Sequence, residues 1–492
     1  MVWGLTRGEV YNRFVRESKM EIPVKLDEEF PIMALISRRA FITGASVTAG
    51  GAGFAAQRRP NIILIMADDL SARELGFYGH REHRTPNLDL LARTGVGFRT
   101  CWATPICSPS RAAIMTGRYA FRTGWFHNDL RGNTPLAREH LTIGQMMKNA
   151  GYATAITGKW QLPGSYDEYG FDEHFMWLEF SDQFTGPVEK ENHQVPGRTA
   201  RYWHPCMVRN GRLYPTTDRD YGPDLSLDFI ADFAARHRRK LFFVYYPMVL
   251  PHGSWDFERN RMGHLPTPKL DPTGRRVPGK SEPTFRANVE YVDYQMGELV
   301  RILEKLDLRE NTVLLFTADN GTAGYGKSRV DGERGPRVPL IANCPGLVKA
   351  IGASDELVDF SDFLPTLAEL AGIRLPTGYV IDGKSFVPAL QGQTDRGREW
   401  IFSVYAVHRF LRDKRWLLDG DGRFYDCGDR RDETGYMDVT ESNAPEVRAA
   451  RERFEQILAR LPGPPDSLRR RWEELVRDQP NRRWRPRSRK AK

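Results

Sequence analysis

Four short apolar stretches, each ending in polar residues, constrain the fold of this chain most strongly. They cover residues 58–66, 152–157, 241–247 and 312–317. Continuous apolar runs of this length are typical of strands that are buried on both faces of a sheet. Amphipathic helical patterns lie between them, over residues 87–95, 141–151 and 289–308. This alternation predicts an α/β fold with a large, mainly parallel sheet that is sandwiched by helices.

The polar residues at the ends of these strands are expected to meet at one rim of the sheet, because ligands of parallel sheets bind beyond the carboxyl ends of the strands. Three carboxylates and an amide oxygen suit a hard divalent cation, calcium or magnesium. Taken singly, Asp-Asp and Asp-Asn-Gly are more often turns or helix caps. The residues that would reach this rim are Asp68, Asp69, Lys159, His252, Asp319 and Asn320.

The segment CSPSRAAIMTGR, residues 107–118, has the pattern of a helix start. Pro109 fits the first turn, and Ser108 or Cys107 falls near the cap. The amino end of a helix attracts anions and lowers the pKa of a thiol, which would allow a nucleophilic cysteine. The alternative is a buried structural cysteine, which is the ordinary role of a lone cysteine.

This segment resembles the signature of the type I sulfatases, members of the alkaline phosphatase superfamily, in which the cysteine is oxidised to Cα-formylglycine. Further segments follow the order of that family: RPNIILIMADDL, TPNLDLLARTG, AGYATAITGKW, LPH, FTADNG, RVPLI and IDGKSFVPAL. The resemblance implies an alkaline phosphatase-like fold and a formylglycine-generating enzyme that acts on Cys107.

The resemblance also implies roles for individual residues. The hydrated aldehyde would attack the sulfur of a sulfate ester and keep a second hydroxyl for the release of sulfate, while Arg111 would hold this diol. Lys159 and Lys327 match two sulfate-binding lysines, and His252 matches a general acid with a pKa in the useful range. The implied ligands of Ca²⁺, with Mg²⁺ as the alternative, are Asp68, Asp69, Cys107, Asp319 and Asn320.

The sequence departs from the family pattern at two places. GKWQLP has Gln161 where family members usually have a histidine that helps to expel sulfate, and glutamine accepts no proton near neutral pH. We expect an orienting role for Gln161, with another base or water taking the proton, or else slow turnover. After Lys327, the sequence SRVDGERGPRVP lacks the usual glycine-rich pattern.

The leading hypothesis is an enzyme that hydrolyses sulfate monoesters, either aryl sulfates or sulfated carbohydrates. A phosphate or phosphonate monoester hydrolase of the same superfamily is the nearest alternative, and a non-catalytic binder of sulfated glycans is the alternative from another class. The Gly-, Pro- and aromatic-rich stretch 180–221 is expected to pass over the rim. Its candidates for lining the entrance are Arg201, Trp203, His204 and Arg209.

Residues 1–57 are expected to form a disordered arm that carries an export signal. Arg38 and Arg39 precede a weakly apolar, Gly- and Ala-rich stretch, which resembles a twin-arginine signal. An adventitious arginine pair is the alternative, and Met33 is an alternative start to Met1. We therefore expect a periplasmic or extracellular protein. No run of about 20 apolar residues occurs, so no transmembrane segment is expected.

Residues 58–392 are expected to form the catalytic α/β domain. From residue 393 to 465, short strands, Asp-Gly turn signals and a helix at 444–461 indicate a smaller α+β subdomain with an antiparallel sheet. Residues 466–492 are expected to be a basic tail, either solvated or disordered, or else a contact for a polyanion or a membrane surface.

The basic charge of the chain is concentrated at its end. Residues 469–492 carry eleven Arg and Lys against three acidic residues, and the whole chain has a formal charge of +9. The folded body is therefore close to neutral, and we expect no nucleic-acid partner. Five cysteines, an odd number, argue against a disulfide framework.

Overall fold

The computed structural model describes residues 59–478, except 129–133, 180, 182, 184–185, 187–198, 257–260, 395–396, 432 and 434. The predicted export signal within residues 1–57 and the predicted tail at 479–492 lie outside the described residues. Within the described part, no helix combines the length and the apolar character needed to cross a bilayer.

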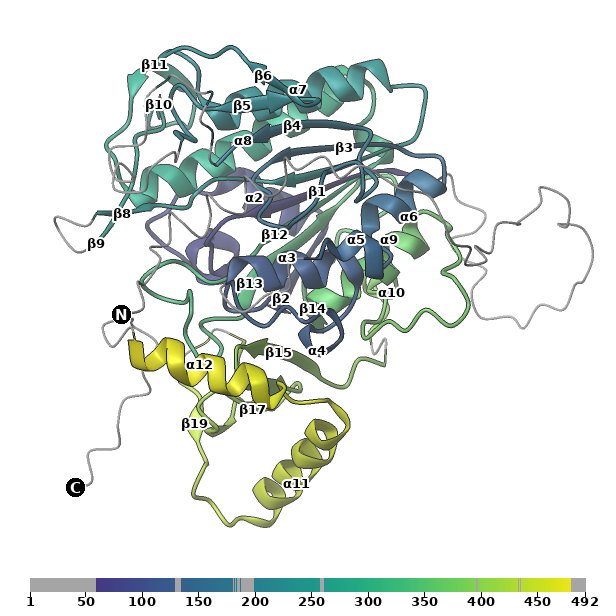
Figure 1. Cartoon of the computed structure of the whole chain (residues 1–492), viewed down its shortest axis with the longest axis vertical. Helices are drawn as coiled ribbons and strands as arrows, with labels where there is room; N and C mark the ends of the chain where they lie inside the picture. The colour runs from purple at the N-terminus through teal and green to yellow at the C-terminus, as the bar shows by residue number, and fades with distance from the viewer. Residues whose placement is uncertain are drawn as a thin grey trace, which may run out of the picture.

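A ten-stranded sheet forms the centre of the molecule, in the order β14-β2-β13-β12-β1-β7-β3-β4-β5-β6 (Figure 1). The four predicted strands are the neighbours β12 (Thr312–Ala318), β1 (Asn61–Ala67), β7 (Phe242–Pro247) and β3 (Ala153–Gly158), which run parallel to one another. Every residue of β1, β7 and β12 is buried, as their continuous apolar sequences predict. The carboxyl ends of these strands therefore share one edge, and this edge positions the site.

Antiparallel strands complete the sheet on both sides of this parallel part. β13 (Arg337–Asn343) runs antiparallel to both β12 and β2 (Val96–Trp102), and β14 (Gly352–Asp359) runs parallel to β2. On the other side, β4 (Glu173–Trp177) is parallel to β3, and β5 (Met207–Arg209) and β6 (Arg212–Tyr214) continue antiparallel. The sheet is thus mixed, with its parallel strands in the middle.

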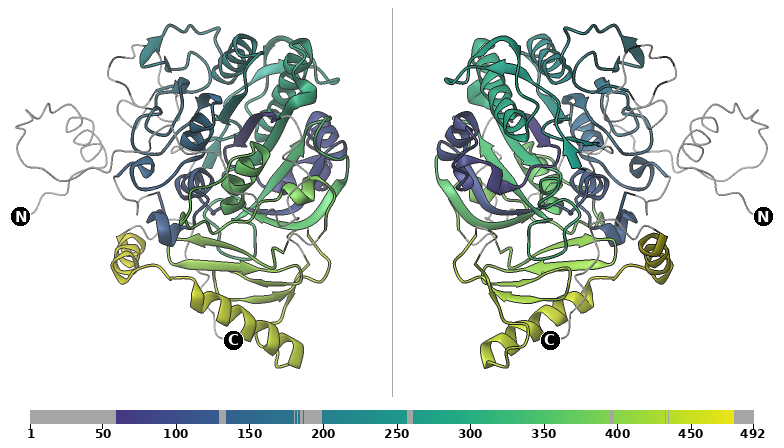
Figure 2. Two further views of the ribbon diagram at one scale, coloured as in Figure 1. Left: turned by 90° about the vertical axis from the view of Figure 1, so that its right-hand side faces the viewer. Right: turned by 90° about the vertical axis from the view of Figure 1, so that its left-hand side faces the viewer.

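Helices cover the two faces of this sheet (Figures 1 and 2). In one layer α8 (Phe285–Lys305) contacts both α2 (Pro86–Arg93) and α7 (Gly222–Arg236). In the other layer α3 (Cys107–Thr116), α6 (Ile143–Asn149) and α9 (Phe363–Leu370) pack together. The predicted helical patterns at 87–95, 141–151 and 289–308 correspond to α2, α6 and α8.

Short elements connect these layers. The short helices are α4 (Ala120–Thr123), α5 (Leu136–Glu139) and α10 (Val387–Leu390), and the 3₁₀ turns are η1 (Ala72–Glu74), η2 (Gly76–Tyr78), η4 (Arg309–Asn311) and η5 (Phe360–Asp362). Two antiparallel ribbons pair β8 (Ser254–Asp256) with β9 (Arg261–Gly263) and β10 (Pro268–Leu270) with β11 (Arg276–Lys280).

A separate five-stranded antiparallel sheet follows in the C-terminal part of the chain (Figure 2). Its strands are β15 (Ile401–Tyr405), β16 (His408–Arg412), β17 (Trp416–Leu418), β18 (Phe424–Asp426) and β19 (Met437–Asp438). The Asp-Gly signals fall in the turn between β17 and β18. α11 (Pro445–Arg460) packs on this sheet through Phe454, whose ring lies 5.3 Å from that of Phe424.

The prediction that the chain continues from residue 466 only as a basic tail is wrong for residues 466–478, which form α12 (Asp466–Asp478). Trp472 is 4% exposed, and its ring lies 5.2 Å from that of His127 and 5.6 Å from that of Tyr405. Leu468, Leu475 and Val476 share this packed face. The arginines between them determined the charge of the segment and obscured its helical apolar spacing.

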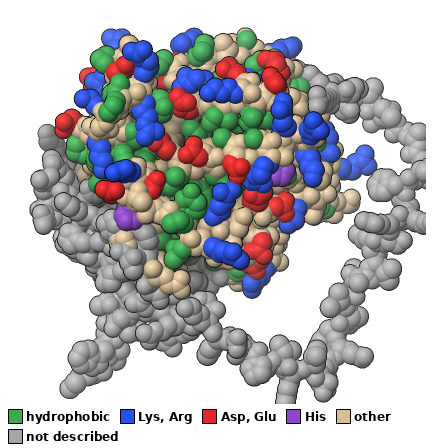
Figure 3. Space-filling view, turned by 90° about the horizontal axis from the view of Figure 1, so that it is seen from above, with side chains coloured by type: hydrophobic (Ala, Val, Ile, Leu, Met, Phe, Trp, Pro, Cys, Tyr) green, Lys and Arg blue, Asp and Glu red, His purple; other side chains and the backbone are tan. Residues whose placement is uncertain are grey.

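Side chains of both charge signs lie on the surface, and no disulfide joins the cysteines of the described residues. Basic and acidic side chains lie side by side on the face seen from above (Figure 3). All five cysteines are buried, each with its sulfur outside any disulfide.

Candidate active site

The ends of β1 and β12 bring four oxygen-bearing side chains together. Asp68 and Asp69 follow β1, and Asp319 and Asn320 follow its parallel neighbour β12. The backbone N–H of Asp69 donates to Oδ1 of Asp319 at 3.0 Å, and Nδ2 of Asn320 donates to Oδ1 of Asp69 at 2.7 Å. Asp69 has a φ of 67°, so the backbone turns directly after the strand and both aspartates can face one point.

This donor set fits a hard divalent cation. Ligand atoms of Asp68, Asp69, Asp319 and Cys107 lie within 4.8 Å of one another. Oδ1 of Asn320 is buried without a hydrogen-bond partner, although its amide nitrogen donates twice. A buried acceptor of this kind is costly, and contact with a cation would satisfy it. Burial and the charge of Asp68 raise the pKa of Asp319 to about 6, as crowding of buried carboxylates does.

Cys107 begins α3, a helix in which every residue is buried. Ile106, rather than Cys107 or Ser108, occupies the N-cap position, and Pro109 lies in the first turn as predicted. Sγ of Cys107 lies 3.9 Å from Oδ1 of Asp68. The expectation that the helix end lowers the pKa of this thiol is wrong, because burial and the charge of Asp319 raise it to about 12. The unmodified thiol is therefore protonated at neutral pH and is no thiolate nucleophile.

Arg111 and Lys159 neutralise two of the carboxylates. Arg111 lies one turn after Cys107 and is 1% exposed; its Nη2 donates to Oδ2 of Asp319 at 2.7 Å, and its Nη1 donates to the carbonyl of Lys159 at 2.9 Å. Nζ of Lys159 donates to Oδ2 of Asp68 at 2.5 Å. Burial opposes ionisation of Asp68, but the charges of Lys159 and Arg111 help to hold its pKa below the usual range.

Lys327 is the cationic partner of the third carboxylate. Its Nζ lies 2.8 Å from Oδ1 and 2.9 Å from Oδ2 of Asp69, and 3.4 Å from Nε2 of His252. The loop that carries it is anchored by the N–H of Ser328, which donates to the carbonyl of Pro105 at 2.7 Å. This contact joins the lysine loop to the segment that leads into Cys107.

The C-terminal part of the chain holds the same loop through one glutamate. Tyr325 donates its hydroxyl to Oε2 of Glu433 at 2.9 Å, and Nη1 of Arg337 donates to Oε1 at 2.7 Å. The side chain of Glu433 is 0% exposed, and its φ of 67° is uncommon for a residue with a side chain. Sequence reasoning missed this contact, since 108 residues separate Tyr325 from Glu433 and no motif joins them.

His252 follows β7, with its Nε2 3.5 Å from Oδ2 of Asp69. Burial lowers the pKa of this imidazole well below its ordinary value; the charge of Asp68 opposes this shift, and the charges of Lys327, Lys159 and Arg201 add to it. The ring is therefore neutral at neutral pH. This differs from the expected pKa in the useful range of a general acid, because the sequence did not reveal how deeply the ring is buried.

Arg201, one of the four residues named for the entrance, contacts a predicted catalytic side chain. Its Nη1 lies 3.1 Å from Nδ1 of His252. Trp203 donates instead to the carbonyl of Pro266 at 2.7 Å, and Arg209 pairs with Asp232 on the surface of α7 at 2.7 Å. The backbone of His204 bonds to Asp220.

Gln161 lies next to the cysteine helix. Its φ is 63°, and its carbonyl accepts a hydrogen bond from Oγ of Ser108 at 3.3 Å. Its Oε1 is buried without a hydrogen-bond partner. The contact with Ser108 brings Gln161 close to the start of the cysteine helix. The orienting role of Gln161 stays a prediction.

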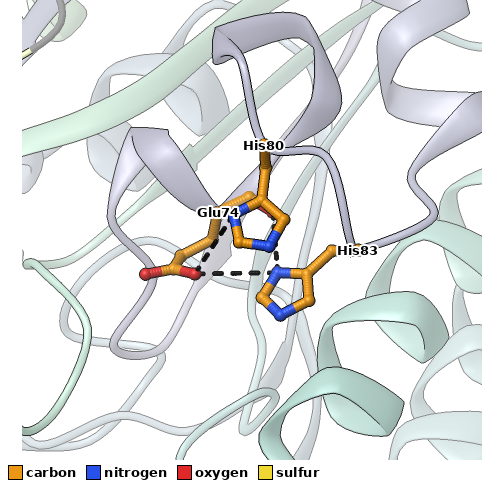
Figure 4. A group of neighbouring side chains, drawn as sticks. All are labelled: Glu74, His80 and His83. Atoms are coloured by element: carbon orange, nitrogen blue, oxygen red, sulfur yellow. Dashed lines mark hydrogen bonds and ion pairs between the residues drawn. The ribbon is translucent and has the colours of Figure 1, made fainter.

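A second group of ligating side chains, Glu74, His80 and His83, lies on the turns after β1 (Figure 4). Oε2 of Glu74 is 3.9 Å from Nδ1 of His80 and 3.6 Å from Nδ1 of His83. The two rings stack at 3.8 Å with 17° between their planes. Because a ring nitrogen binds a metal in the plane of its ring, rings stacked in this way do not converge on one ion.

These two histidines also line a cavity of about 760 Å³ between α2, α8 and the β10–β11 ribbon. Each Nδ1 faces a backbone carbonyl, that of Arg73 at 3.1 Å for His80 and that of Glu74 at 3.0 Å for His83. None of the predicted catalytic residues lines this cavity. The group therefore links the turns after β1 to one another, and the candidate catalytic site lies at the strand ends.

Comparison with known proteins agrees with this placement. The sulfatase family model matches residues 60–373. N-acetylgalactosamine-6-sulfatase of Canis lupus familiaris is 30% identical over 403 residues, which cover 74% of this chain and 72% of that protein. Arylsulfatase A of Bos taurus is 32% identical over 396 residues, which cover 72% of each. The crystal structure of Ps i-CgsB has a TM-score of 0.65 at 25% identity, over 81% of this chain and 92% of that one. This chain therefore belongs to the sulfatase family of the alkaline phosphatase superfamily and is a hydrolase of sulfuric esters.

Proposed function

We propose that the enzyme hydrolyses sulfate monoesters with a formylglycine formed from Cys107 and a divalent cation, calcium or alternatively magnesium. One observation carries the proposal: the side chain at position 107 lies beside three buried carboxylates that are paired with Lys159, Lys327 and Arg111. In the site without a cation, burial and Asp319 raise the pKa of the thiol to about 12, which makes the thiol a poor nucleophile. A hydrated aldehyde at the same position would supply an oxygen nucleophile instead.

A cation in this site would be held by oxygens of Asp68, Asp69, Asp319 and Asn320, and it would supply positive charge that polarises a sulfate ester. The orphaned Oδ1 of Asn320 supports this assignment. Neither histidine nor a second cysteine belongs to this donor set, which favours calcium or magnesium over zinc.

The chain's own side chains would bind and orient the sulfate group. Lys159 pairs with Asp68 and Lys327 pairs with Asp69, so their ammonium groups lie close enough to the site to neutralise the negative charge of a sulfate. Arg111 would orient the modified side chain one turn before it. His252, with its neutral ring, would donate a hydrogen bond from Nε2 to the ester oxygen and stabilise the negative charge that develops there as the bond between that oxygen and sulfur breaks. The departing oxygen takes its proton from water, the attacking hydroxyl loses one to water, and the oxygen that remains on the released sulfate comes from water through the hydrated side chain.

The substrate class that we propose is an aryl sulfate or a sulfated carbohydrate. Two relatives support it by name, because they are an arylsulfatase and a sulfatase of N-acetylgalactosamine 6-sulfate. A formylglycine-generating enzyme would be the partner required for maturation. Export by the twin-arginine pathway is part of the proposal, and replacement of Arg38 and Arg39 by lysine should retain the enzyme inside the cell. Unchanged export of that variant would contradict the signal assignment.

The decisive experiment combines mass spectrometry and turnover. The tryptic peptide that ends at Arg111 should contain formylglycine in protein from a host that makes the modification, and Cys107→Ala should abolish turnover. The specificity constant for 4-nitrophenyl sulfate should exceed those for the phosphate and phosphonate analogues. A larger constant for a phosphorus ester would favour the phosphate or phosphonate hydrolase. An unmodified thiol together with binding of sulfated glycans would favour the non-catalytic alternative.

A further inference from the structure

The segment that precedes α7 holds His252 from two sides. Nη1 of Arg201 lies 3.1 Å from Nδ1 of the ring. The hydroxyl of the next residue, Tyr202, donates to the carbonyl of His252 at 2.7 Å and to that of Val249 at 2.9 Å. Arg201 and Tyr202 are each 1% exposed. One dipeptide therefore fixes both the backbone and the ring of the residue proposed to donate a hydrogen bond to the leaving oxygen.

The contact with Arg201 determines which ring nitrogen carries the hydrogen. A guanidinium group has five donors and no acceptor, so Nδ1 of His252 has to accept. A neutral imidazole has one N–H, and that hydrogen therefore lies on Nε2. The close approach of Lys327 to Nε2 at 3.4 Å is then no hydrogen bond, and its ammonium group donates to Asp69 instead.

The position of Arg201 is itself fixed by packing. Its guanidinium carbon lies 5.0 Å from the ring centroid of Trp177 in β4. Trp177 in turn donates from Nε1 to Oγ1 of Thr199 at 3.0 Å. A side chain with four rotatable bonds is held in this way with little freedom, and a cation at Nδ1 polarises the ring and strengthens donation from Nε2.

We propose that Arg201 is a positioning residue that holds His252 as the tautomer with hydrogen on Nε2 and directs this hydrogen to the leaving oxygen of the sulfate ester. The inference rests on the role proposed for His252. It adds a residue that no family motif in the sequence indicates. The contact that carries this inference is the one between Nη1 of Arg201 and Nδ1 of the imidazole.

The test uses aryl sulfates whose phenols span a wide range of pKa, because a hydrogen bond to the leaving oxygen helps most where the most negative charge develops on it, as with a poor leaving group. At one fixed pH, Arg201→Met should lower kcat/KM for phenyl sulfate by about 10²-fold and for 4-nitrophenyl sulfate by less than about tenfold. Arg201→Lys, which keeps a donor, should recover part of this loss. Tyr202→Phe is the matched control, because it removes a hydrogen bond from the backbone alone and should lower kcat/KM equally for every leaving group.

A double-mutant cycle shows whether Arg201 acts through the ring. In a His252→Ala background, Arg201→Met should cause no further leaving-group-dependent loss. An equal loss for every substrate, an increase for poor leaving groups, or an undiminished loss in the His252→Ala background would overturn the proposal. If His252→Ala itself lowered kcat/KM equally for every leaving group, the role of His252 would be overturned. If the unaltered enzyme hydrolysed no sulfate ester, the proposed function would be overturned.

A second measurement does not require the variants to fold equally well. Nitrogen NMR of the full chain with labelled histidine distinguishes the two neutral tautomers, and the His252→Ala spectrum identifies the signals of His252. The expected spectrum has hydrogen on Nε2 and an acceptor at Nδ1. Hydrogen on Nδ1 in the unaltered protein would refute the proposal directly.

Discussion

Asn320 offers a test of the cation site that leaves the fold nearly unchanged. In Asn320→Leu, the donations from Nδ2 to Asp69 at 2.7 Å and to the carbonyl of Gly321 at 2.9 Å are lost, which costs about 1.5–3 kcal/mol for the charged acceptor and about 1 kcal/mol for the carbonyl. The same substitution removes the buried Oδ1 that has no partner, and this relieves about 1–3 kcal/mol. The gain offsets most of the loss, so the chelated variant should be about 1 kcal/mol less stable than the unaltered protein.

The two proteins should differ once calcium is added. At a calcium concentration of 100 times the dissociation constant, binding stabilises the unaltered protein by about 2.7 kcal/mol. Loss of one ligand that weakens binding tenfold lowers this gain by about 1.4 kcal/mol. The assay is thermal unfolding with EDTA and with calcium, together with calorimetric titration of the chelated proteins.

Asn343→Leu is the matched control for this experiment. Asn343 is also buried, but it bonds to the carbonyl of Leu91 at 2.8 Å, away from the carboxylates. Its replacement should destabilise the protein with and without calcium and leave the calcium response intact. If Asn320→Leu binds calcium as tightly as the unaltered protein, the assignment of Oδ1 as a ligand is refuted.

Three further outcomes follow from the packing and charge of the described residues. Trp472→Ala should lower the free energy of unfolding by about 3 kcal/mol, measured by urea denaturation, because α12 docks through this ring. An unchanged free energy would mean that residues 466–478 do not pack on the body and form a tail. Burial lowers the pKa of His264 from 6.5 to about 4. Between pH 6.5 and pH 4 the unfolded chain therefore binds more protons than the folded chain. The free energy of unfolding should fall by up to about 3 kcal/mol as the pH drops through this range. His264→Phe should flatten that part of the pH profile, and an identical slope in the variant would contradict the cause. Glu433→Ala should lower stability by about 3 kcal/mol, because it leaves Arg337 without its closest carboxylate, whereas Glu433→Gln should cost less.

The sequence was sufficient to predict the parallel part of the sheet and the residues at its edge. Continuous apolar runs appear only where both faces of a strand are covered, and the polar residues after them fall at the same edge by topology. The cysteine segment was recognisable because its capping and turn residues are local in the chain. These predictions use information within about ten residues of each position.

Contacts between distant segments could not be predicted in the same way. The partner of Nδ1 of His252 is 51 residues away in the chain, and the side chain that holds Tyr325 is 108 residues away. The raised pKa of Cys107 depends on burial and on Asp319, neither of which the helix-end argument considers. The high net charge of residues 466–478 favours a solvated segment, but a single apolar face is enough for α12 to pack on the body.

The bond between Tyr325 and Glu433 has a consequence for the order in which the molecule is completed. During synthesis, the segment with Lys327 leaves the ribosome long before Glu433 does, since 108 residues separate Glu433 from Tyr325. Before Glu433 is made, the nascent chain can pair its central strands and bring its aspartates together, but it lacks the hydrogen bond that anchors the segment with Lys327. Translation products that end before Glu433 therefore lack one of the anchors of the loop that carries Lys327.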